Sequence, residues 1–109
     1  MYSSNYMYHH EKEELHGFLA KADQESGKKR PAVLVAHDWS GRNDFACQKA
    51  QMLADMGYVG FALDMYGDAK VGATDEECSS LMTPFVQDRK LLQERMLLAL
   101  EAMKKAVSH

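Results

Sequence analysis

The chain has 109 residues, which limits it to one small domain. Sixteen acidic residues against thirteen basic ones give a formal charge of -3, and outside Lys28 to Arg30 the basic residues are scattered, so nothing indicates a nucleic-acid partner. No stretch approaches the roughly 20 apolar residues that span a bilayer, and residues 1–14 lack the apolar core of a signal peptide. We therefore expect a cytoplasmic protein without a membrane partner.

The first 30 residues predict two antiparallel strands followed by a polar connection. Residues 2–10 are rich in tyrosine and partly alternate, and residues 15–20 form a short apolar run, with the two strands joined near Lys12 to Glu14. Residues 23–30 are polar and include three consecutive basic side chains, which is typical of a solvated loop rather than of a binding patch.

An apolar run at 32–37 is the centre of the predicted fold. It has no polar residue before its last position, so it suits a strand that is covered on both faces, as in a parallel sheet. A helix that is capped by Asn43 or Asp44 and ended by Gly57 follows, and it leads to a second apolar strand at 58–63. Strand, helix and strand together predict a βαβ unit with a right-handed crossover.

The βαβ unit brings two polar strand ends, 37–42 and 64–68, to the same edge of the sheet. Ligands of open α/β sheets bind in the crevice beyond the carboxyl ends of the strands, because loops vary there while the strands hold them still. We therefore expect the functional site at this edge. For Asp64 and Asp68 themselves, capping and turn formation after a strand is the favoured interpretation.

Two helices are predicted in the last third of the chain. Thr74 and the acidic residues after it are typical of a capped helix start, which opens a short helix. Thr83 and Pro84 predict that the chain then starts a new helix, because a proline at the first helical position loses nothing through its missing N–H. A stripe of apolar residues marks this second helix as long and amphipathic, over residues 84–106.

Three side chains stand out as candidates for a nucleophile, but none has the sequence around it that a nucleophile needs. Ser40 is preceded by Asp38 where a Gly-x-Ser-x-Gly turn requires glycine. Cys47 and Cys78 lie in helical segments, outside any such turn, where unreactive thiols are usual. Because they also lack CxxC and Cys/His spacing, neither a zinc site nor a disulfide is predicted.

No metal and no cofactor are expected from the sequence. His37 and Asp38 are adjacent in an extended segment, so their side chains point to opposite faces. The chain has no GxGxxG motif and no Walker lysine, which disfavours a flavodoxin-like nucleotide binder. The other histidines lie near the ends or in the first strands, at His9, His10, His16 and His109.

Three segments taken together resemble the dienelactone hydrolase family of α/β-hydrolases. They are Val33 to Asn43, Leu53 to Tyr58 and Asp64 to Gly67, and the match runs from about His16 to Lys105. The resemblance implies that residues 1–109 form a partial dienelactone hydrolase-like α/β domain. Its fold would be the N-terminal half of an α/β-hydrolase sheet, with two leading strands, a central βαβ unit and a long C-terminal helix.

The resemblance also implies a hydrolase activity, and it shows which of the residues needed for that activity are not in this sequence. Family members hydrolyse small esters or lactones with a Cys (or Ser), Asp and His triad, whose nucleophile lies in a Gly-x-Cys-x-Gly turn. That turn belongs to the strand after the long helix, so all three triad positions are absent and we expect the chain to be inactive alone. Between Val71 and Asp88 there is also no basic residue, so the arginine that some members use for a substrate carboxylate has no counterpart.

Two residues of this chain match family positions at the active site. Trp39 matches the position whose backbone N–H forms half of the oxyanion hole, a role that needs only a correctly aimed amide. Asp38 matches an acidic position, commonly glutamate, that in some members interacts with the resting cysteine nucleophile. Because aspartate is one methylene shorter than glutamate, the carboxylate of Asp38 reaches less far toward the nucleophile.

Without the strand of the nucleophile, the run at 32–37 becomes an edge strand. Its unpaired N–H and C=O groups are available to a partner strand, and the adjacent helix faces would expose a large apolar patch. We therefore expect self-association through this edge or through the long helix, which gives a homo-oligomer, or pairing with a separate C-terminal half. The alternative function is a non-catalytic α/β module that binds itself or another chain.

Overall fold

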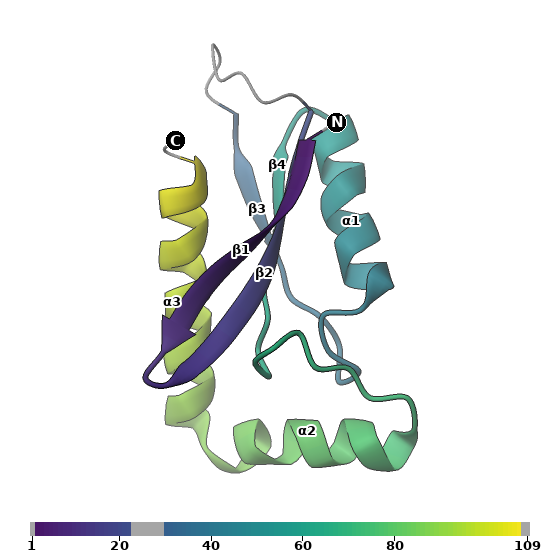
Figure 1. The fold of residues 1–109 in the computed structure, drawn as a ribbon, viewed down its shortest axis with the longest axis vertical. Coiled ribbons are helices and arrows are strands. Elements are labelled where there is room, and N and C mark those ends of the chain that lie inside the picture. The colour runs from purple at the N-terminus through teal and green to yellow at the C-terminus, as the bar shows by residue number, and fades with distance from the viewer. Residues whose placement is uncertain (1, 23–29, 108–109) are drawn as a thin grey trace.

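The computed structural model describes residues 2–22 and 30–107, which form a four-stranded sheet with helices on both faces (Figure 1). Helix α1 covers one face, α3 covers the other, and α2 lies across the end at which the parallel strands finish. The elements are β1 (Tyr2–His10), β2 (Glu13–Lys21), β3 (Ala32–Val35), α1 (Asp44–Asp55), β4 (Val59–Ala62), α2 (Asp75–Gln87) and α3 (Arg89–Val107). The predicted α/β class is confirmed, and the loop predicted at 23–30 lies outside the described residues except for Arg30.

The sheet has the strand order β1-β2-β4-β3. β1 and β2 are antiparallel over their whole length, and β3 is parallel to β4, with Val33 opposite Gly60. The predicted hairpin and the βαβ unit are therefore confirmed. Within the described residues β3 pairs with β4 alone, so it is an edge strand of this sheet, as the sequence predicted for 32–37.

Two strand boundaries differ from the prediction. β3 ends at Val35 rather than at His37, because its neighbour β4 ends at Ala62 and the last ladder bond runs from Leu63 N–H to the Val35 carbonyl at 3.0 Å. The hairpin turn falls at residues 11–12, just before the predicted joint, and Glu11 has the positive φ of 57° that a tight turn requires.

The α1 face of the sheet is packed with small residues. A Cβ on Gly60 of β4 would lie 2.3 Å from the carbonyl oxygen of Ala50, so this position accepts only glycine. The close approach of helix and strand places alanines at every buried position between them. These are Ala20, Ala46, Ala50, Ala54 and Ala62.

The α3 face is packed with large residues around Phe61. Phe61 is fully buried, and its ring lies 6.0 Å from the ring of Tyr6 and 6.3 Å from that of Tyr8. The side chains of Leu19 and Met103 close the cluster from β2 and α3. Because α3 is positioned by this contact, the cluster sets where the C-terminal helix lies relative to the strand ends.

The break between α2 and α3 lies at Asp88, so the predicted helix start at Thr83 is wrong. Pro84 lies inside α2, and the Thr83 hydroxyl donates to the Ser79 carbonyl, one turn earlier in the helix, at 2.6 Å. Asp88 caps α3 instead, because its carboxylate accepts from Leu91 N–H at 3.2 Å. None of the helices described here is long and apolar enough to cross a membrane.

Candidate functional site

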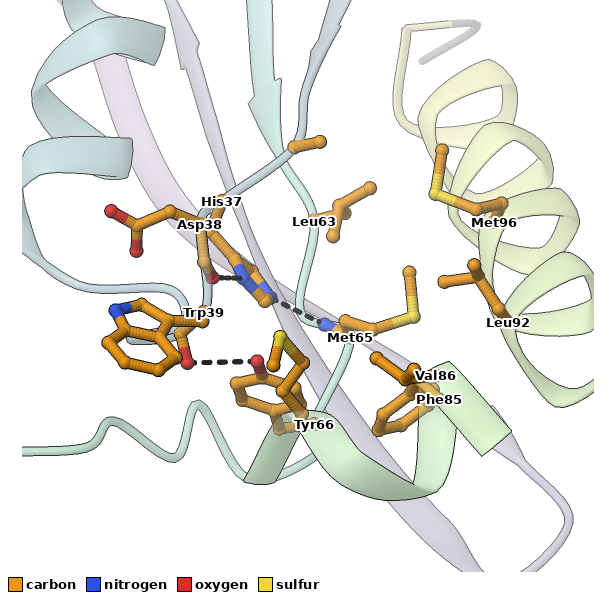
Figure 2. Close-up of a pocket in the computed structure, with 12 residues that line it drawn as sticks. His37, Asp38, Trp39, Leu63, Met65, Tyr66, Phe85, Val86, Leu92 and Met96 are labelled. Carbon is orange, nitrogen blue, oxygen red and sulfur yellow. Dashed lines mark hydrogen bonds between the residues drawn. The ribbon is translucent and has the colours of Figure 1, made fainter. Parts of the chain in front are cut away.

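The two polar strand ends meet at one edge of the sheet, as the sequence predicted (Figure 2). Met65 N–H donates to Nε2 of His37 at 3.0 Å, and the hydroxyl of Tyr66 donates to the carbonyl oxygen of Trp39 at 2.9 Å. The rings of His37 and Tyr66 are also in contact, with centroids 5.0 Å apart. These contacts fix the turn after β3 to the turn after β4.

A cavity of about 310 Å³ lies between this edge and helices α2 and α3 (Figure 2). This volume is at the lower end of the range of small-molecule sites, about 300–1,000 Å³. Its walls are mainly apolar, and none of the residues that line it is a serine, threonine or cysteine. The lining residues from the helices are Met82, Phe85, Val86, Leu92 and Met96.

His37 is held as a neutral imidazole. Since its Nε2 accepts from Met65 N–H, the ring proton is on Nδ1, which donates to the Asp38 carbonyl oxygen at 2.7 Å. Burial lowers the pKa of His37 below its usual 6.5, although the Asp38 carbonyl opposes this effect. With both nitrogens engaged, His37 positions the Met65 turn and offers no nitrogen to a metal.

We expect His37 to make the stability of the fold depend on pH. Because its pKa is lower in the folded chain, the unfolded chain binds the proton more readily, and the free energy of unfolding is greatest above about pH 6.5 and falls as the pH is lowered. His37→Gln, which keeps an acceptor for Met65 N–H, should reduce this dependence in urea unfolding between about pH 7 and 5. His9→Gln, on an exposed residue, should leave it unchanged, and an equal effect of both variants would contradict the assignment.

The backbone of Trp39 has a bonded carbonyl and an N–H without an acceptor among the described residues. Its carbonyl is held by the Tyr66 hydroxyl, and within residues 2–22 and 30–107 its N–H donates to no group. Trp39 is 39% exposed. A backbone amide with an unused N–H, at a residue that lines an apolar cavity, is the kind of donor that oxyanion sites use.

Asp38 is exposed and ionised. Its Oδ1 accepts from Ser40 N–H at 2.9 Å and from the Ser40 hydroxyl at 2.6 Å, and these two hydrogen bonds hold the pKa of Asp38 below its usual range. The same contact accounts for the role of the Ser40 side chain. Its hydroxyl serves the turn, and no histidine of the described residues contacts it as a base.

Neither cysteine lies at the cavity. Cys47, in α1, accepts from Nη1 of Arg42 at 3.0 Å. Cys78, in α2, is buried and donates to the Gly72 carbonyl at 3.6 Å, and burial raises the pKa of its thiol. The prediction that both are outside a nucleophile turn is confirmed, since each lies within a helix.

Asp64 organises the turn after β4. It is 1% exposed, and its carboxylate accepts from His16 N–H at 2.8 Å, Gly67 N–H at 3.0 Å and Ala69 N–H at 2.8 Å. The interpretation of Asp64 as a turn-forming residue is confirmed. By holding this turn, Asp64 determines where the Met65 and Tyr66 that line the cavity lie.

Arg95 also supports the site, and sequence reasoning missed it. This residue of α3 is 6% exposed, and its Nη1 donates to the Met65 carbonyl at 2.8 Å while its Nε donates to Nδ1 of His10 at 2.9 Å. Glu13 completes the group as an ion pair with Nη2 at 3.2 Å. No local signal separates Arg95 from the exposed charges around it, because its partners come from β1, β2 and the 64–69 turn.

Comparisons with known proteins agree on one family. The model of the dienelactone hydrolase family matches residues 15–109. A crystal structure of a dienelactone hydrolase-like promiscuous phosphotriesterase from metagenomic libraries has a TM-score of 0.87 and 31% sequence identity, and a structure named m3DLH has a TM-score of 0.85 and 27% identity. Both alignments cover 94% of this chain and 42% of the other chain, so this chain spans about two fifths of their length.

A third structure extends the likeness in fold alone. It comes from Klebsiella pneumoniae subsp. pneumoniae MGH 78578 and has a TM-score of 0.70 at 17% identity, covering 98% of this chain and 43% of that chain. No match was found among curated proteins.

Proposed function

This chain belongs to the dienelactone hydrolase family, and we propose that it is the N-terminal part of an ester or lactone hydrolase whose triad is supplied by residues beyond this sequence. The observation that carries the proposal is the free amide of Trp39 at the rim of an apolar cavity. The solved relatives, of which this chain covers 42%, support it. The substrate class is a small ester or lactone.

The proposed reaction uses the strand edge as half of an active site. A thiolate or alkoxide attacks the carbonyl carbon of the substrate, and the carbonyl π electrons move to its oxygen. The N–H of Trp39, together with the amide that follows the nucleophile, donates to this oxyanion. When the C–O bond of the ester breaks, the alkoxide leaves and takes a proton from the triad histidine, and water then releases the acid.

We assign Asp38 to the acidic position near the nucleophile. Its carboxylate is ionised and is kept in place by Ser40 at the end of β3. A carboxylate at this point would accept a hydrogen bond from the thiol of the resting nucleophile. Because its reach is one methylene shorter than that of glutamate, this role depends on how close the nucleophile strand lies to β3.

The purified chain should not hydrolyse p-nitrophenyl acetate above the buffer rate, because its cavity holds no nucleophile. Refolding it with a C-terminal half that carries Gly-x-Cys-x-Gly should restore hydrolysis. In that reconstituted enzyme Trp39→Pro, which removes the N–H, should lower kcat by about 10²-fold, the usual effect of losing one oxyanion donor.

Trp39→Ala is the matched control, because it removes the indole and keeps the amide, and it should retain most of kcat. Equal losses in both variants would refute the oxyanion role. Hydrolysis by the chain alone that thiol reagents abolish would refute the proposed absence of a nucleophile and would direct attention to Cys47 and Cys78.

The alternative is a non-catalytic module that associates with itself, and the open side of β3 favours it. The carbonyls of Pro31 and Val35 accept from Val59 N–H and Leu63 N–H of the β4 side. Backbone groups alternate in direction along a strand, so the N–H and C=O of Ala32, Leu34 and Ala36 face away from β4. Within the described residues no strand pairs with these groups. A strand from a second copy of the chain, or from a separate C-terminal half, would pair with them.

We also propose a cytoplasmic location. The two free thiols, Cys47 and Cys78, suit a reducing compartment. Cell fractionation with an antibody against the chain tests this, and recovery in a secreted fraction would contradict it.

A further inference from the structure

Two carboxylates and an imidazole meet outside the cavity. Glu14 and His16 lie at the start of β2, and Asp68 lies in the turn after β4, about 50 residues later. Nε2 of His16 is 3.3 Å from Oε1 of Glu14 and 3.8 Å from Oδ1 of Asp68. One donor atom from each of the three lies within 4.8 Å of the other two.

The backbone beneath these side chains is fixed by hydrogen bonds that are buried or partly buried. The carboxylate of Asp64 accepts from His16 N–H and from the two amides on either side of Asp68, those of Gly67 and Ala69. In addition, Asp68 N–H donates to the Glu14 carbonyl at 2.9 Å. The segments that carry the three side chains are therefore held together by main-chain contacts, whatever the side chains do.

The neighbouring acidic residue, Glu13, has another partner. Glu13 is paired with Arg95 at 3.2 Å, so it is engaged on the α3 side. Glu14 and Asp68 are both exposed, and their carboxylates share one imidazole. Like charges this close repel each other unless a cation lies between them.

The three donor atoms are close enough together to reach one metal ion. Ligand bonds of about 2.0–2.2 Å in a tetrahedron place neighbouring donor atoms about 3.4 Å apart, close to the two distances that His16 makes. Imidazole together with carboxylates suits zinc and related dications. We propose that Glu14, His16 and Asp68 bind a divalent transition-metal ion, with zinc as the fitting ion and a water molecule as the fourth ligand.

Zinc titration of the full chain, purified without a histidine tag, tests the proposal. Isothermal titration calorimetry should give one site per chain, and zinc should raise the midpoint of thermal unfolding, since an ion that binds the folded state stabilises it. His16→Gln should weaken zinc binding at least about tenfold, since the loss of even an outer-shell partner costs about 10–100-fold. This variant keeps the backbone N–H that Asp64 binds, so it should fold normally.

Asp68→Asn and Glu14→Gln should weaken zinc as well, whereas Glu76→Gln, which removes an exposed carboxylate of α2, should not. Cobalt reports the ligands directly, because tetrahedral coordination by nitrogen and oxygen gives visible d–d bands without the thiolate charge-transfer band of a cysteine ligand. Zinc affinity that is unchanged in His16→Gln, or a thiolate band from Cys47 or Cys78, would overturn the proposal and leave an ion-pair cluster.

Discussion

Asp64→Ala is expected to leave most of the chain unfolded in water. The substitution strips the acceptor from three backbone N–H groups, one of them fully buried, and each orphaned donor costs about 1–3 kcal/mol. The total of about 3–9 kcal/mol is comparable to the whole stability of a small domain, about 5–15 kcal/mol. Urea unfolding followed by circular dichroism should show a lower midpoint or no transition.

Asp55→Asn is the matched control. This aspartate is exposed at the C-terminal end of α1, where a negative charge opposes the helix dipole, so its loss should be neutral or slightly stabilising. A loss of less than about 1 kcal/mol in Asp64→Ala would mean that water replaces the carboxylate. In that case the turn that carries Met65 and Tyr66 is held by other contacts.

Ala36→Pro is expected to shift the chain from oligomer to monomer. Ala36 is exposed, and its N–H lies on the side of β3 that faces away from β4. A proline there removes a donor from the open edge and blocks addition of a strand. The ladder bond between Leu63 N–H and the Val35 carbonyl remains possible. Light scattering after size exclusion, at low micromolar concentration, measures the change in mass.

Arg89→Pro is the control for a proline without this effect. Arg89 is the first residue of α3, where a proline is tolerated, and the preceding Asp88 is already extended, with φ −132° and ψ 93°. It should keep the mass of the unchanged chain. If the unchanged chain is itself a stable monomer at that concentration, association through β3 is wrong.

The sequence predicted the fold well where local patterns decide it. The apolar runs became β3 and β4, and Asn43 became the cap of α1 through its bond to Ala46 N–H at 3.1 Å. The boundary at Thr83 was wrong because a Thr-Pro pair occurs both at the first turn of a helix and inside a helix, where the threonine hydroxyl bonds a carbonyl one turn earlier. The two positions of the pair are distinguished only by the cap of the next helix, which is Asp88 at the start of α3.

The parts of the site that sequence reasoning missed depend on contacts between distant elements. Arg95 looks like one more exposed charge of a helix until His10 and Met65 are placed beside it. The cluster of Glu14, His16 and Asp68 forms only because the β2 register and the 64–69 turn bring the three residues together. The sequence has no metal-binding motif that would have predicted it. The role of Trp39 stays a prediction that only the missing half of the site can test.

The two faces of the sheet differ in how they respond to mutation. Around Phe61 the side chains are large, so truncation leaves a void, and the usual loss for such a change is about 3–5 kcal/mol. Under α1 the buried side chains are already those of alanine and glycine, and the backbones of Gly60 and Ala50 are in contact. Truncation can therefore remove little there. Most substitutions of these alanines and of Gly60 introduce a larger side chain, which would push α1 away from the sheet. The α1 face therefore tolerates substitution less well than the α3 face, although its buried side chains are smaller.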